Sequence, residues 1–202
     1  MGSKALGFTV EQENLIWDLH RHGESLGEIE RVLGVTMPRI RRFLRESGHL
    51  EGDLVFGARP SAVATLVNRQ TRAVHVVALP DCYRAETVAD ALIAHLGRPP
   101  AHLRRSLTWD RGREMAEHER ITAALDMPVY FCAPHHPWQR GTNENTNGLL
   151  RQYLRKNADL RTLTQDDLNR VADRLNDRPR RVLDWDSPRQ REEQVLGSCA
   201  TG

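Results

Sequence analysis

The sequence predicts an α/β fold with a mixed five-stranded sheet flanked by helices, preceded by a small all-α helix-turn-helix domain. Two patterns predict this fold. Three short amphipathic segments with helix-start signals come before residue 48. Three apolar strand-like segments follow, and then helical and strand-like segments alternate. Successive strands with short turns suit antiparallel pairing, whereas strands separated by helices suit parallel pairing. A hydrophobic content of 39% is enough for a folded core.

The N-terminal segment contains two capping boxes and one glycine turn. Thr9 with Gln12, and Ser25 with Glu28, have the spacing at which a side chain caps a helix start. A third helix is expected from Met37 to Glu46, after the turn Gly34-Val35-Thr36. The apolar residues expected inside these helices are Leu15, Ile16, Leu19, Ile29, Val32, Leu33, Ile40, Phe43 and Leu44.

The third of these helices has a basic face. Its four arginines are Arg39, Arg41, Arg42 and Arg45. Residues 1–50 as a whole balance their charges, so this local excess is specific to one helix. The pattern favours a DNA-binding helix-turn-helix over the alternative, a three-helix bundle with a solvated basic face.

The second part of the chain supplies the sheet and its helices. Strands are expected over 50–57, 62–67, 73–79, 106–109 and 129–132, and helices over 86–96, 115–125, from about 143, and from a capping box at Thr164 and Asp167. The polar chain after Pro188 is expected to be frayed. The predicted domains are therefore 1–48, 49–188 and a disordered tail over 189–202.

The composition excludes several classes of protein. Only Lys4 and Lys156 are lysine among 29 basic residues, so 27 are arginine. Arginine forms forked hydrogen bonds to phosphate, although a GC-rich genome explains the excess equally well. Three cysteines without a CxxC pair argue against a disulfide framework and a structural zinc site. No apolar stretch is long enough to span a membrane. These features predict a soluble cytoplasmic protein without a membrane partner.

Residues 134–154, PHHPWQRGTNENTNGLLRQYL, form the most unusual stretch. A loop with two prolines precedes a helix that begins near Asn143. On a helical projection, Gly148, Arg151 and Arg155 lie within roughly 40° of Glu144. An ordinary charged surface helix is the alternative. The polar and aromatic side chains crowded into the loop and around the acid favour a functional site; they are His135, His136, Trp138, Gln139, Arg140, Asn143 and Asn145.

Three carboxylates are candidates for a metal site. Asp53 lies within an apolar strand, Asp110 follows a short strand, and Glu144 lies on the open face of its helix. Taken singly, Asp53 could be an edge-strand residue that points to water, and Asp110 a turn residue before Gly112. Together they suit two Mg²⁺ ions, which activate a water or a 3′-hydroxyl and stabilise the leaving oxygen of a phosphodiester. Their convergence is a hypothesis.

These residues resemble a known family. Asp53, Asp110 and Glu144, with 33 residues between the last two, resemble the DDE transposases of the RNase H-like superfamily. More closely, the chain resembles the insertion-sequence thirty family of bacterial transposases. The stretches that carry the resemblance are EGDLVFG (51–57), LTWDRGREMAEH (107–118), VYFCAPHHPWQRGTNENTNGLLRQYLRK (129–156) and LNDRPRRVL (175–183).

The resemblance implies an RNase H-like catalytic core and a Mg²⁺-dependent recombinase, with Mn²⁺ as a substitute. Such an enzyme binds terminal inverted repeats, cleaves the strands and joins the 3′-hydroxyl to target DNA. It implies a homo-oligomer on double-stranded DNA, associated with the bacterial nucleoid. It also implies that the three carboxylates are the metal ligands, that Arg151, Asn143 and Asn145 contact DNA near the scissile phosphate, and that Trp138, Gln139 and Arg140 shape the entrance.

The chain departs from the family pattern in three places. Only Ser47, Gly48 and His49 separate the helix-turn-helix from the core, where the family has a much longer segment. Leu50 stands where a tryptophan is common, and residues 189–202 differ. The chain therefore looks like an internally deleted version with its catalytic core intact. Two other functions are considered: a non-catalytic DNA-binding relic or regulator of the full-length transposase, and a metal-dependent nuclease acting on RNA–DNA hybrids.

Overall fold

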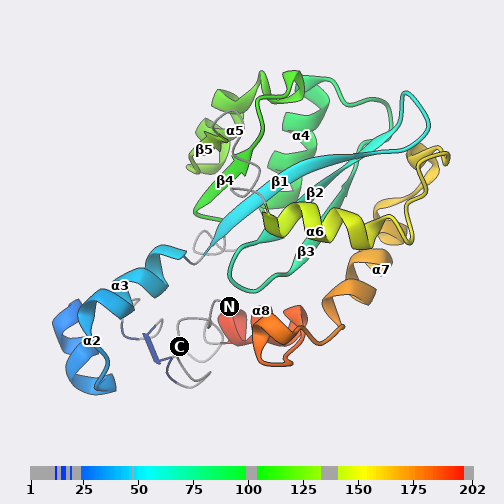
Figure 1. The fold of residues 1–202 in the computed structure, drawn as a ribbon. Helices are drawn as coiled ribbons and strands as arrows, with labels where there is room; N and C mark the ends of the chain where they lie inside the picture. The colour runs from blue at the N-terminus through cyan, green and yellow to red at the C-terminus, as the bar shows by residue number, and fades with distance from the viewer. Residues whose placement is uncertain are drawn as a thin grey trace. The chain divides into compact units, whose positions relative to one another are not determined.

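The chain forms two compact units. A computed structural model describes residues 24–46, 48–98, 104–132 and 141–197, together with Gln12, Leu15, Ile16 and Leu19 (Figure 1). One unit is Met1–Ser47 with Asp177–Gly202, and the other is Gly48–Asn176. The predicted domains 1–48 and 49–188 stay a prediction.

The larger unit is built on a mixed five-stranded sheet, as the sequence predicts. Its strands are β1 (His49–Phe56), β2 (Ala62–Asn68), β3 (Val74–Ala78), β4 (Ser106–Trp109) and β5 (Val129–Phe131), in the order β3-β2-β1-β4-β5. The first three strands pair antiparallel, and β4 and β5 are added in parallel beyond β1. β1 is thus the central strand, and the alternative that Asp53 lies on an edge strand is wrong.

Helices cover both faces of this sheet. α4 (Ala85–Leu96) and α5 (His118–Leu125) pack on one face, and α6 (Gly141–Leu150) and α7 (Gln165–Asn176) pack on the other (Figure 1). Alternate residues of β1 serve the two cores: Leu50 and Leu54 pack toward α4 and α5, whereas Val55 packs toward α6 and α7. All seven residues of β2 are buried because both of its faces are covered. None of the helices in the described part of the chain is long and apolar enough to cross a bilayer.

Two helices of the larger unit differ from the prediction at their ends. α5 begins at His118, after a 3₁₀ turn over Arg113–Met115, rather than at Met115. α6 ends at Leu150, whereas its apolar pattern continues to Leu154. The backbone leaves the helix there because the N–H of Tyr153 donates to the carbonyl of Leu150, a tighter turn than the α-helix makes (2.9 Å). Leu154 is nevertheless buried in the core under α6 and α7.

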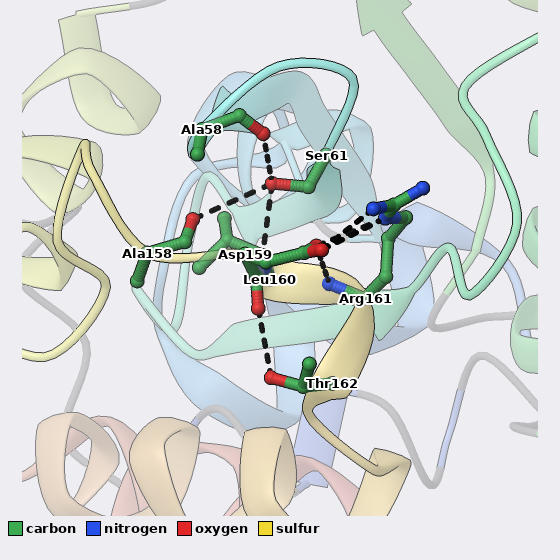
Figure 2. Close-up of polar contacts among 7 residues, drawn as sticks. All are labelled: Ala58, Ser61, Ala158, Asp159, Leu160, Arg161 and Thr162. Carbon is green, nitrogen blue, oxygen red and sulfur yellow. Dashed lines mark hydrogen bonds and ion pairs between the residues drawn. The ribbon is translucent and has the colours of Figure 1, made fainter.

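The chain after α6 is attached to the β1–β2 loop by a compact hydrogen-bond cluster (Figure 2). The hydroxyl of Ser61 donates to the carbonyl of Ala58 (2.6 Å) and accepts the N–H of Leu160 (3.0 Å). The N–H of Ala58 donates to the carbonyl of Ala158 (2.8 Å). A β-carbon at Gly57 would lie 2.3 Å from that same carbonyl oxygen, so only glycine permits the contact. The cluster fixes the segment that follows α6 against the far end of β1.

In the smaller unit, α2 (Leu26–Leu33) and α3 (Met37–Glu46) follow the predicted caps and turn. The hydroxyl of Ser25 accepts the N–H of Glu28 (3.2 Å), and Gly34 ends the helix in the left-handed conformation at φ 64°. The core consists of Ile16, Ile29, Val35, Ile40 and Phe43. Val32, expected in this core, is 50% exposed, because it lies outside the stripe formed by Leu26, Ile29 and Leu33.

A helix forms where we expected a disordered tail. α8 spans Pro188–Gly197. The N–H of Gln190 donates to the hydroxyl of Ser187 (3.2 Å), and the N–H of Ser187 donates to Oε1 of Gln190 (2.8 Å). This reciprocal pair is a capping box with proline at the first helical position. The sequence Ser-Pro-Arg-Gln contains the signal, so the prediction of disorder over 189–197 is corrected.

A histidine pair between α4 and β3 makes stability depend on pH. The rings of His95 and His75 are 5.4 Å apart between centroids, and burial lowers the pKa of His95 to about 4. The unfolded chain binds this proton near pH 6.5 and the folded chain does not, so stability is lost as the pH falls from about 6.5 toward 4. We expect urea unfolding to show a loss of about 2 kcal/mol over this range from His95 alone. The variant His95→Gln should lose this part of the pH dependence, and the control variant His118→Gln should keep it. If the unfolding free energy of His95→Gln falls with pH as steeply as that of the wild type, this role of His95 is wrong.

Candidate active site

Asp53 lies in the middle of the central strand, on the face of the sheet that α6 covers. Its side chain is partly buried. Oδ1 accepts the backbone N–H of Leu54 (2.9 Å), and Oδ2 accepts Nδ2 of Asn147 from α6 (3.1 Å). Two hydrogen bonds therefore orient this carboxylate, one of them from the helix that carries Glu144.

Asp110 immediately follows β4, the strand that pairs in parallel with β1. Glu51 of β1 is opposite Thr108 of β4, and the two aspartates follow these residues by two positions each. The recorded pairing of the two strands therefore ends two residues before each aspartate. Leu107 and Trp109 of β4 pack toward α4 and α5. Its Oδ1 also accepts the N–H of Gly112 (3.1 Å), as the turn alternative predicts.

Gly52 and Trp109 set how closely the two aspartate strands approach. A β-carbon at Gly52 would lie 2.1 Å from two carbons of the Trp109 ring. The ring is fully buried, and its Nε1 donates to Oε1 of Glu114 (3.1 Å). Each residue immediately precedes one of the candidate ligands. The sequence analysis did not identify this contact; a glycine within an apolar strand is the signal that points to a close approach.

Glu144 lies in the first turn of α6 and is exposed. α6 packs across β1 and β2 (Figure 1). One turn further along the helix, a β-carbon at Gly148 would meet nothing within 4 Å, so the surface beside the acid is open. Asp53 thus lies on the face of the sheet that α6 covers, and Glu144 lies on α6; the convergence of all three carboxylates stays a prediction.

The asparagines of α6 differ in their surroundings. Asn143 is fully buried: its backbone N–H donates to Oε2 of Glu51, and its Nδ2 donates to the carbonyl of Glu51 (both 3.0 Å). Its Oδ1 accepts the hydroxyl of Thr65 (3.2 Å). The side chain of Asn143 is therefore hydrogen bonded to partners inside the protein, and the predicted DNA contact by Asn143 is corrected to an internal contact. Asn145 is exposed, and its contact with DNA stays a prediction. Asn147, which the sequence analysis missed, holds Asp53.

The structure describes only some of the arginines that we predicted to bind DNA. Arg151 is partly buried, and its Nη1 donates to the carbonyl of Phe56 at the end of β1 (2.6 Å). On α3, Arg39 is partly buried and Arg41 is exposed. The side chains of Arg42 and Arg45, and the whole of Trp138, Gln139 and Arg140, lie outside the described residues. Their roles remain predictions.

The residues fit a divalent cation by donor type. Carboxylate oxygens are the ligands that Mg²⁺ prefers, and Asp53, Asp110 and Glu144 each supply one carboxylate. Within the residues that the structure describes, no three His, Cys, Asp or Glu side chains are already gathered as a metal-binding group. The three candidate ligands thus do not form a closed cage.

Comparisons with known proteins agree with this fold. Residues 44–137 match the integrase core domain family, a range that contains Asp53 and Asp110 and ends before Glu144. The catalytic core domain of BIV integrase is similar in structure, with a TM-score of 0.56 at 16% identity, over 76% of this chain and 98% of that domain. At this identity the similarity concerns the fold, which is that of the RNase H-like integrase cores.

Curated relatives share much more of the sequence. The transposase for insertion sequence element IS1086 of Cupriavidus metallidurans is 53% identical over 155 residues, which is 75% of this chain and 44% of the relative. Transposase InsI for insertion sequence element IS30A of Escherichia coli is 48% identical over 173 residues, which is 84% of this chain and 45% of the relative. The chain thus spans less than half the length of these relatives.

Proposed function

Because this chain belongs to the insertion-sequence thirty family of DDE transposases, we propose that it cleaves DNA strands at the ends of an element and joins them to target DNA, using divalent metal ions. The observation that carries the proposal is the register of β1 and β4. It supports the proposal because the pairing of β1 with β4 runs to Glu51 and Thr108, two positions before Asp53 and Asp110.

In this proposal Asp53, Asp110 and Glu144 hold the metal ions. The bound ions supply an activated water or 3′-hydroxyl and stabilise the leaving oxygen of the phosphodiester. The protein itself contributes by holding these carboxylates in position. Asn147 orients Asp53 through its hydrogen bond, and the sheet sets the separation of the two aspartates. The open surface beside Gly148 gives a DNA strand room to approach Glu144.

Double-stranded DNA is the proposed partner, with the ends bound by a helix-turn-helix. α2 and α3 are joined by the tight turn at Gly34, and Arg41 is exposed on α3. A helix of this kind lies in the major groove and reads bases, while arginines contact phosphates. Arg151 and Asn145 are proposed to contact the strand near the carboxylates, and a homo-oligomer is proposed to hold the DNA ends together.

The test is nicking of supercoiled plasmid by the purified chain. We expect nicking with Mg²⁺ or Mn²⁺, none with EDTA, and a loss of at least about 10³-fold in Glu144→Gln, because a missing ligand disrupts metal-assisted cleavage. Glu144 is exposed, so this substitution should leave the unfolding free energy within about 0.5 kcal/mol of the wild type.

Each outcome of this test decides between functions. Metal-dependent nicking that disappears in Glu144→Gln supports the transposase core. DNA binding by both folded proteins without nicking, on plasmids with and without the element's ends, overturns the proposal in favour of a non-catalytic DNA-binding regulator. Cleavage confined to the RNA strand of an RNA–DNA hybrid would instead identify a hybrid-specific nuclease.

A further inference from the structure

Glu51 is a buried carboxylate that the proposed chemistry does not use. It lies two residues before Asp53 on the same face of β1, and it is only 2% exposed. Burying a carboxylate is costly unless it is paired and hydrogen bonded. Its partners come from two other parts of the fold: Oε2 accepts the backbone N–H of Asn143 on α6 (3.0 Å), and Oε1 lies 3.1 Å from Nε of Arg69, in the turn after β2.

The contact with α6 is made in the first turn of the helix. α6 begins at Gly141, so Asn143 carries one of the N–H groups that have no partner within a helix. Such a group is usually capped by a nearby residue of the same segment. Here a carboxylate from the central strand accepts it, at the end of the helix that favours negative charge. The carbonyl of Glu51 also accepts Nδ2 of Asn143, so two hydrogen bonds join the same two residues.

These contacts are adjacent to the proposed metal ligands on both elements. Asn143 immediately precedes Glu144 on α6, and Glu51 precedes Asp53 by one alternation of β1. A second contact between the helix and the strand lies one helical turn further along, where Asn147 donates to Asp53. We propose that Glu51 is a positioning residue, which fixes the start of α6 against β1 and so sets where Glu144 stands relative to Asp53. This inference rests on the proposed function of the three carboxylates.

The sharpest variant is Glu51→Gln, because it keeps the shape and changes one acceptor into a donor. Both carboxylate oxygens of Glu51 face N–H donors, one from Asn143 and one from Arg69. The amide group of the variant must direct its NH₂ at one of these donors. Adding Arg69→Gln supplies an amide oxygen in place of the guanidinium. The amide of Glu51→Gln can then turn its oxygen toward the N–H of Asn143. The double variant should therefore recover the plasmid nicking rate of the wild type.

A matched control variant separates an effect on the position of Glu144 from a general loss of protein stability. Asn176 on α7 is buried on the same face of the sheet, and it makes two hydrogen bonds to the backbone of Val74 in β3 (2.8 and 2.9 Å). Asn143 likewise bonds the backbone of a strand, but on the helix that carries Glu144. Asn143→Ala and Asn176→Ala should therefore lower the unfolding free energy to a similar extent, and only Asn143→Ala should impair the site.

The experiment compares Glu51→Gln, its double variant with Arg69→Gln, Asn143→Ala and Asn176→Ala, all in the full chain. The readouts are the plasmid nicking rate at saturating DNA, the KM for plasmid, urea unfolding, and Mn²⁺ binding measured by water-proton relaxation. We expect Glu51→Gln and Asn143→Ala to lower the saturated rate and weaken Mn²⁺ binding by about 10- to 100-fold, as for other groups that orient metal ligands. The KM for plasmid, the rate of Asn176→Ala and the rate of the double variant should stay near wild type.

The outcomes for the two proposals can be told apart. If the wild type nicks DNA, and Glu51→Gln keeps the rate and the Mn²⁺ affinity, the positioning role is overturned while the transposase function stands. If Asn176→Ala loses as much rate as Asn143→Ala, the effect is general destabilisation and the role is again overturned. If the wild type binds Mn²⁺ without cutting, and Glu51→Gln weakens that binding, the positioning role stands and the proposed function fails.

Discussion

Asp53→Asn is expected to reduce metal-dependent strand cleavage by at least about 10³-fold, as large a loss as we expect for Glu144→Gln. The variant loses the negative charge from the central position of the site. Its amide can still accept one hydrogen bond, from Leu54 or from Asn147, so the fold should be kept. Plasmid nicking measures the loss, and near-ultraviolet circular dichroism checks that the protein remains folded.

A comparison with Asp110→Asn tests whether the two aspartates act as one unit. If both hold the metal ions, as proposed, removing either charge should cost about as much activity as removing both. Losses that multiply in the double variant would show that the aspartates act independently. Cleavage at the wild-type rate in Asp53→Asn would remove Asp53 from the chemistry altogether.

Gly52→Ala is expected to destabilise the larger unit by about 3 kcal/mol, at the upper end of the cost of overpacking a core. The new methyl group would lie 2.1 Å from the ring of Trp109. The ring cannot move away easily, because it is fully buried and its Nε1 is bonded to Glu114. Strands β1 and β4 must then separate, so cleavage should fall together with stability. Urea unfolding measures the first effect and plasmid nicking the second.

Gly148→Ala provides the matched control for stability. A β-carbon at Gly148 meets nothing within 4 Å, and the residue lies inside α6, where alanine is favoured over glycine by about 1 kcal/mol. The same chemical change should therefore stabilise the protein at one glycine and destabilise it at the other. Equal effects at Gly52 and Gly148 would show that the strand glycine is not required by Trp109.

Much of the fold follows from local sequence patterns. All five strands were predicted to within about two residues, because each is a short apolar run bounded by turn residues, and such runs leave few alternatives. The helix over 188–197 was missed although its capping box stands in the sequence, because its polar composition and terminal place were given more weight than Ser187 and Gln190.

The candidate site could also be predicted only in part from the sequence. Its carboxylates could be named from their places in strands and on a helix, and their convergence stays a prediction. The inward role of Asn143 could not be predicted, because it depends on Glu51, which is 92 residues away in the chain. Helical projection separates two faces, but it does not show which polar side chains the sheet will take as partners. Contacts between distant segments require the strand order, which no spacing in the sequence contains.

The order of the strands also has a consequence for the time course of folding. β1, β2 and β3 form a local antiparallel meander, and hairpins of this kind close within microseconds. β4 reaches β1 only by closing a loop of 57 residues, and α6 reaches it across 92. Long closures of this type are late steps in folding. A chain leaving the ribosome therefore completes its meander well before β4 and α6 reach β1. The proposed site would then form only at this last stage of assembly.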